Sequence, residues 1–134
     1  SYYLQKKINA EFFMVIDITN KPKKFYKEQK FVNFKEKWFL HDYTLPEKNV
    51  DVEYLKEFEE KYKIDLWNLA INERLFYRFN DFYKFSRLEI LSILEKECKL
   101  FENILDSTKP DFAVLHEPFF HSDELFYRIC NLKV

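Results

Sequence analysis

The feature that most constrains this chain is the absence of glycine from all 134 residues, where average usage would place about nine. Glycine lets a backbone approach a phosphate closely, and both the P-loop and the Gly-x-Gly-x-x-Gly turn of dinucleotide-binding domains depend on it. Neither motif is present, so the chain lacks the usual backbone turns that hold a pyrophosphate. We therefore predict no cofactor bound within this chain.

The composition predicts one globular domain spanning residues 1–134. Hydrophobic residues make up 47% of the chain and charged residues 34%, a balance that supports a packed core. A net charge of −1 argues against nucleic acid as a partner, because phosphate binding uses an excess of basic side chains. The chain has no apolar run long enough to cross a bilayer and no signal-peptide pattern. Cys98 and Cys130 are expected to be buried thiols, so we predict a cytoplasmic protein.

Three short apolar segments predict strands. Glu11–Ile18 is a nearly continuous apolar run of the kind found in strands buried on both faces. Lys37–Leu40, extended to Tyr43, and Asp111–Leu115 are the other two. Helices are expected between and around the strands, at Tyr2–Asn9, from Pro22 to Phe34, from Asp51 to about Lys63, at Leu66–Phe79, from the Ser86/Glu89 capping box to the Lys109-Pro110 stop, and from a Ser122 cap onward.

Alternating helices and strands predict an α/β fold with βαβ units and a mostly parallel sheet between two layers of helices, as in Rossmann-like domains. A helix rather than a strand comes first in this order. We therefore expect the opening strand to lie upstream of Ser1, which would make this chain an N-terminally incomplete part of a larger protein.

Polar residues follow each predicted strand, and ligands of open parallel sheets bind beyond the carboxyl ends of the strands. All three histidines would fall at this one edge of the sheet. The residues expected there are Asp17, Asn20, His41, Asp42, His116, Glu117 and His121.

Histidine titrates near neutral pH, so His116 or Glu117 is the predicted catalytic base, and the other residues are predicted to bind substrate. The alternative is that these polar groups only cap strands and helices. The ligand types would suit a metal, but no spacing is diagnostic, and we predict no metal site.

A second candidate is the segment Trp67–Arg87, which interleaves arginines with aromatic residues. Arg74 and Arg78 are predicted to contribute to substrate binding, because arginine beside aromatic rings can grip sugars, phosphates or bases. The alternative is that two helices pack their aromatic side chains into the core.

Three segments carry a resemblance to a known family. The run KPDFAVLHEPFF (Lys109–Phe120) resembles a segment near the end of glycosyltransferase N-terminal domains. The blocks Asn72–Leu91 and Phe13–Gln29 are similar to those of capsule and surface-polysaccharide biosynthesis proteins. The resemblance covers most of the chain, and none of its motifs is a catalytic signature.

The resemblance implies the N-terminal half of a two-domain, glycosyltransferase-like enzyme with two Rossmann-like halves. That half usually holds the saccharide acceptor, while a C-terminal domain, missing here, would bind the sugar nucleotide. We therefore predict an acceptor-side domain that is inactive when isolated. The alternative is a non-catalytic, flavodoxin-like binding or regulatory module.

Overall fold

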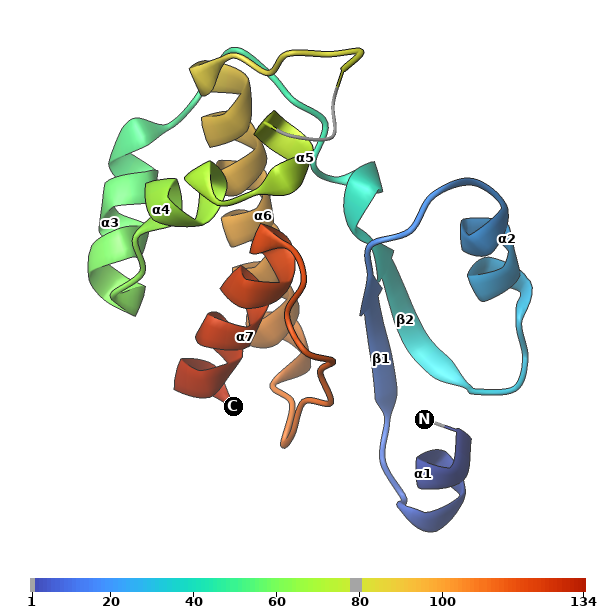
Figure 1. Ribbon diagram of the computed structural model, residues 1–134. Coiled ribbons are helices and arrows are strands. Elements are labelled where there is room, and N and C mark those ends of the chain that lie inside the picture. The colour runs from blue at the N-terminus through green and yellow to red at the C-terminus, as the bar shows by residue number, and fades with distance from the viewer. Residues whose placement is uncertain (1, 78–80) are drawn as a thin grey trace. The chain divides into compact units, whose positions relative to one another are not determined.

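The computed structural model describes residues 2–77 and 81–134, and the chain divides into two compact units, Ser1–Tyr43 and Thr44–Val134 (Figure 1). Strands occur in the first unit, and the described part of the second unit consists of helices and irregular segments. The protein is therefore α/β, mostly helical, with a parallel sheet of two strands.

The first unit is built around a βαβ arrangement. Helix α1 (Tyr2–Lys7) precedes strand β1 (Phe12–Ile16), helix α2 (Asn20–Glu28), strand β2 (Phe34–Phe39) and a 3₁₀ turn (Leu40–Asp42). The two strands are parallel, with Val15 opposite Trp38 and Ile16 opposite Phe39. The predicted parallel pair with a helix between its strands is confirmed.

The side chains of β1 are only half-buried, so the prediction of a strand buried on both faces is wrong. Its one strand partner within the described residues is β2. Burial in this unit is concentrated instead at the end of β2, in Trp38, Phe39 and Leu40, and the Trp38 ring stacks on Phe13 with centroids 6.1 Å apart.

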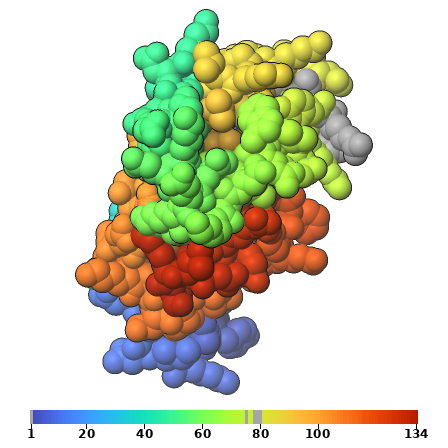
Figure 2. All heavy atoms as spheres, turned by 90° about the vertical axis from the view of Figure 1, so that its left-hand side faces the viewer, coloured from blue at the N-terminus to red at the C-terminus, as the bar shows by residue number. Residues whose placement is uncertain are grey.

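The second unit packs helices around α6 (Arg87–Thr108), whose buried face includes Leu94, Cys98 and Phe101. The surrounding helices are α3 (Val52–Tyr62), α4 (Leu66–Ile71), α5 (Arg74–Tyr77) and α7 (His121–Lys133). Figure 2 shows the face of this unit on which the green residues of α3 and α4 meet the red residues of α7. Both cysteines are buried free thiols, as predicted.

Side-chain caps define where these helices begin. Asp51 accepts a hydrogen bond from the Tyr54 backbone N–H at 3.0 Å, and Ser86 forms the predicted reciprocal capping box with Glu89. The predicted Ser122 cap is wrong. Helix α7 begins one residue earlier, Ser122 is buried within it, and the Asp123 carboxylate accepts from the Phe120 N–H at 3.0 Å.

The predicted helix Leu66–Phe79 is interrupted. Helix α4 ends at Ile71, where the Asn72 side chain turns back to donate to the Asn68 carbonyl at 2.9 Å, and α5 starts at Arg74. Phe79 lies outside the described residues. Short polar side chains compete with the helical hydrogen-bond pattern in this way, which accounts for the break.

The predicted third strand, Asp111–Leu115, is wrong, because this segment is irregular and its side chains are exposed. A strand requires a neighbouring strand to satisfy its backbone N–H and C=O groups, and the described part of the second unit contains none. Pro110 and Pro118 bracket the segment and restrict regular pairing at its ends. Without this strand, the three-layer architecture is not confirmed.

Left-handed backbone conformations occur at three described residues, Asn20, Lys63 and Lys109, with φ of 55°, 55° and 43°. Lys63 and Lys109 directly follow α3 and α6, at the position where helices commonly use glycine. The chain has no glycine to place there, so lysine takes a conformation that costs an L-residue roughly 1–2 kcal/mol.

Candidate functional site

The carboxyl edge of the parallel strand pair brings Asp17 and His41 together. Asp17 directly follows β1, and His41 lies in the 3₁₀ turn directly after β2. Their contact, from His41 Nε2 to Asp17 Oδ1, measures 2.7 Å. The His41 side chain is 50% exposed and that of Asp17 is 22% exposed, while the Asp17 Oδ1 atom that faces His41 is itself buried. A ligand in solvent can therefore reach the pair from the His41 side. The sequence predicted that these two residues would share this edge, and the structure agrees.

A second ion pair lies in the same unit, between Asp42 and Lys23 of α2. The hydrogen bond and positive charge of Lys23 hold the pKa of Asp42 below its usual value. Lys23 also lies 5.4 Å from the centre of the Phe39 ring. The remaining candidate here, Asn20, is exposed and begins α2. The βαβ unit therefore presents carboxylate, imidazole and ammonium groups after its strands.

His116 and Glu117 do not follow a strand. They lie in the exposed irregular segment before α7, in the second unit. The His116 side chain is 72% exposed, its Nε2 atom is 3.6 Å from Asp123 Oδ1, and its Nδ1 atom is 2.6 Å from the Glu117 carbonyl oxygen. The structural reason for expecting these two residues at the sheet edge is thus lost, although both are accessible to a ligand.

His121 is enclosed between two carboxylates. Its Nδ1 atom is 2.7 Å from Glu73 Oε2 and its Nε2 atom is 2.9 Å from Glu97 Oε2, and the three side chains are 7%, 2% and 3% exposed. The ring also lies against Phe76, with centroids 5.0 Å apart. With both ring nitrogens paired, His121 is suited to joining α7 to the rest of the core rather than to meeting a substrate.

The charge of this buried cluster follows from its geometry. Burial lowers the pKa of His121, but the charge of Glu97 and the hydrogen bonds to Glu73 and Glu97 outweigh burial and raise the pKa to about 10. The imidazole is therefore positively charged at neutral pH. A charged histidine between two carboxylates balances groups that would be costly to bury separately.

Three of the residues in these contacts were not among the predicted site residues. They are Glu73 and Glu97 beside His121, and Lys23 beside Asp42. Glu97 carried a signal that could have found it, because it lies three residues after Leu94 and four before Phe101, in phase with the apolar face of α6. A carboxylate on such a face must find a buried partner. Glu73 and Lys23 carried no comparable signal.

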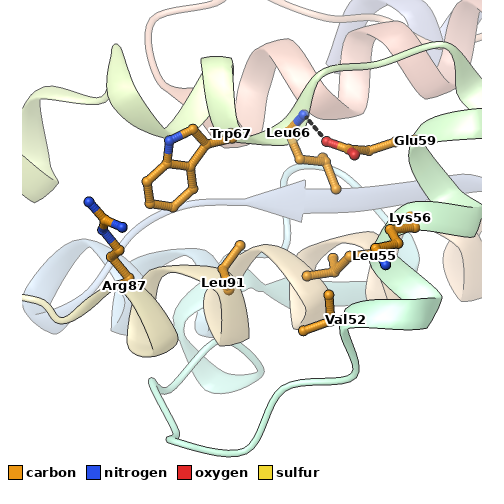
Figure 3. A pocket seen from close by; sticks show the side chains of 8 residues that line it. All are labelled: Val52, Leu55, Lys56, Glu59, Leu66, Trp67, Arg87 and Leu91. Atoms are coloured by element: carbon orange, nitrogen blue, oxygen red, sulfur yellow. Dashed lines mark hydrogen bonds between the residues drawn. The ribbon is translucent and has the colours of Figure 1, made fainter.

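The arginine-rich segment gives a mixed result. Arg74 is exposed at the start of α5 and makes no hydrogen bond or ion pair to any residue that the structure describes. Arg78 lies outside the described residues. Arg87, the first residue of α6, lines a pocket of about 310 Å³ together with Trp67 and side chains of α3 (Figure 3). The pocket is thus formed within the second unit.

The structure provides no group of three or more His, Cys, Asp or Glu side chains that could hold a metal ion within residues 2–77 and 81–134. Among the same residues, no helix is both long and apolar enough to cross a membrane. No protein-family model, curated protein or solved structure matches the chain. The functional argument therefore depends on the geometry of the chain itself.

Proposed function

We propose that this chain is the acceptor-side domain of a glycosyltransferase-like enzyme that acts in the cytoplasm, in surface or capsular polysaccharide biosynthesis. The observation that carries the proposal is the Asp17–His41 pair at the carboxyl edge of two parallel strands. Open parallel sheets bind their ligands at this edge. The β1–α2–β2 unit is the repeating element of a Rossmann-like sheet, and we propose that it belongs to a larger three-layer sheet in the complete protein.

The pair suits the chemistry of an acceptor hydroxyl. In glycosyl transfer, the hydroxyl oxygen bonds to the sugar's anomeric carbon, the bond from that carbon to the donor phosphate breaks, and the hydroxyl proton must leave. Asp17 Oδ1 contacts the His41 ring, while the second carboxylate oxygen has no hydrogen bond to any described residue. We propose that this oxygen accepts a hydrogen bond from the acceptor hydroxyl and then its proton.

His41 would act by positioning Asp17, through the 2.7 Å contact between its Nε2 atom and Asp17 Oδ1. His116 and Glu117 are a second candidate pair for the base, supported by their exposure and by the position of Asp123 beside the His116 ring. The donor sugar nucleotide would be bound mainly by a C-terminal domain, which accords with the absence of glycine-based phosphate turns from this chain.

Saccharide binding to the chain tests the proposal. Oligosaccharides of bacterial surface polymers, titrated against the ¹⁵N-labelled chain, should shift the amide signals of residues 16–18 and 40–42. Asp17→Asn should weaken binding by roughly tenfold, the loss of one charge-assisted hydrogen bond. Glu11→Gln is the matched control, because Glu11 is an exposed carboxylate of the same unit that pairs with Lys35 at the opposite, amino ends of the two strands.

Equal effects of the two substitutions would contradict a site at Asp17. The absence of saccharide binding across the panel would instead favour the alternative of a non-catalytic, flavodoxin-like binding module, which has the same sheet but no acceptor to activate.

A further inference from the structure

A groove in the second unit lies between α3, α4 and the first turns of α6 (Figure 3). Its volume of about 310 Å³ is at the lower end of the range for small-molecule sites, about 300–1,000 Å³. Aliphatic side chains make up half of the lining residues, and charged side chains lie at its ends (Figure 3). The lining residues are Val52, Leu55, Lys56, Glu59, Leu66, Trp67, Arg87 and Leu91.

Trp67 and Arg87 occupy one end of this groove. In Figure 3 the Arg87 guanidinium extends from α6 toward the Trp67 indole on α4. The same two side chains also line a neighbouring pocket of about 390 Å³, so they form the wall that the two cavities share. The Trp67 ring and the Arg87 guanidinium can therefore contact the same ligand, beside the apolar side chains of the groove.

The charged side chains of the lining are two cations, Arg87 and Lys56, and one carboxylate, Glu59, so their net charge is positive. Arg87 is exposed and makes no hydrogen bond or ion pair with any residue described by the structure. Glu59 is the carboxylate of the lining, and it already accepts a hydrogen bond from the Leu66 backbone N–H at 2.8 Å. Lys56 adds a second cation, with only a 4.0 Å contact to Glu53 outside the groove. An anionic ligand would therefore find complementary charge there.

The position of Arg87 supports a role in binding. It is the first residue of a 22-residue helix, where the helix dipole favours anions and disfavours a cation. An arginine at this unfavourable position, with no ion pair to a carboxylate among the described residues, is the kind of local conflict that proteins retain at functional sites. An anion bound at Arg87 would also be favoured by the dipole of α6.

We infer that this groove binds a small sugar bearing an anionic group, with its carboxylate or phosphate held by the Arg87 fork and its less polar face against Trp67. The choice of a sugar rests on the function proposed above. The expectation of a ring and an anionic group comes from Trp67 and Arg87 in the groove itself. In the proposed enzyme, this site would select an acceptor that carries an acidic sugar unit.

The experiment observes the indole N–H signals of the chain's two tryptophans by NMR. Trp67 lies in the groove, while Trp38 is buried in the first unit and serves as an internal control. The probes are glucuronate, glucose 6-phosphate, neutral glucose and benzoate. We expect glucuronate or glucose 6-phosphate, but not glucose, to shift the Trp67 indole signal and leave the Trp38 signal unchanged. The probe that binds more tightly identifies whether the groove prefers a carboxylate or a phosphate.

Arg87→Gln should weaken this binding about tenfold, the lower end for loss of a charge-assisted hydrogen bond. Arg128→Gln is the matched control, since Arg128 is an exposed arginine of the same unit that pairs with Glu124 and does not line the groove. Equal losses in both variants, or no shift of Trp67 with either anionic sugar, would overturn the inference. A response to benzoate alone would also overturn it, by showing that the ligand is not a sugar.

The two proposals fail separately. Asp17→Asn should leave the Trp67 titration unchanged, because Asp17 belongs to the other unit. A Trp67 response that persists when no saccharide shifts the Asp17 region would contradict the function proposed above and retain the groove as a binding site. A saccharide response at Asp17 without one at Trp67 would contradict only the groove.

Discussion

Replacing His121 with alanine removes the positive charge that two buried carboxylates contact. Glu73 and Glu97 are 2% and 3% exposed, and each lies within 3 Å of a His121 ring nitrogen. Breaking a buried ion pair by deleting one partner costs about 3–5 kcal/mol, a large share of the 5–15 kcal/mol by which a typical domain is stable. We therefore expect His121→Ala to lower the free energy of unfolding by about 3–5 kcal/mol.

The pH dependence separates this loss of charge from a simple cavity. Since the folded pKa of His121 is about 10 and the unfolded value is 6.5, its contribution to stability is complete below pH 6.5 and is lost as pH rises through about 10. The loss of stability in His121→Ala should therefore be smaller at pH 9.5 than at pH 7. Urea unfolding followed by circular dichroism at both values measures it.

Leu125→Ala is the control, because Leu125 is fully buried one turn further along α7 and carries no charge. It should cost about 2–5 kcal/mol to the same extent at both pH values. A His121→Ala loss below about 1 kcal/mol at pH 7, or one equal at pH 7 and pH 9.5, would refute the reasoning.

Three other substitutions test the fold of the second unit by the same unfolding assay. Lys109→Gly should stabilise by about 0.5–1 kcal/mol, because glycine adopts the left-handed conformation after α6 without the cost to an L-residue, and a loss would contradict this. Ser86→Ala should destabilise by about 1 kcal/mol through loss of the capping box, and no change would mean that the cap is not formed in solution. Leu94→Ala should cost about 2–5 kcal/mol since Leu94 is fully buried, and a loss below about 0.5 kcal/mol would place that face of α6 in solvent.

The elements that the sequence predicted best are those specified by local chemistry. The Ser86/Glu89 box and the apolar repeat of α6 both act within a few residues, and the structure shows both. The run that became β1 was recognisable because it is a short, continuous apolar segment in which four of five residues favour strands. The Asp17–His41 contact followed from these, since neighbouring parallel strands end at one edge.

Features that depend on distant partners were less predictable. Asp111–Leu115 has side chains typical of a strand, but a strand also needs a neighbour, and no local pattern reveals whether one is present. The partners of His121 lie 24 and 48 residues away along the chain, at Glu97 and Glu73. Only the position of Glu97 on an apolar helix face hinted that a buried cation was required.

The central claim is that Asp17 serves an acceptor hydroxyl at the edge of the parallel strands. Glycosyl transfer to a saccharide acceptor, measured with the chain joined to the proposed donor-binding domain, tests it most directly. Loss of a catalytic base costs about 10²–10⁴-fold in rate, so Asp17→Asn should lower turnover by at least about 100-fold, while Glu11→Gln leaves it unchanged. Turnover by Asp17→Asn within a few-fold of the native rate would contradict the claim.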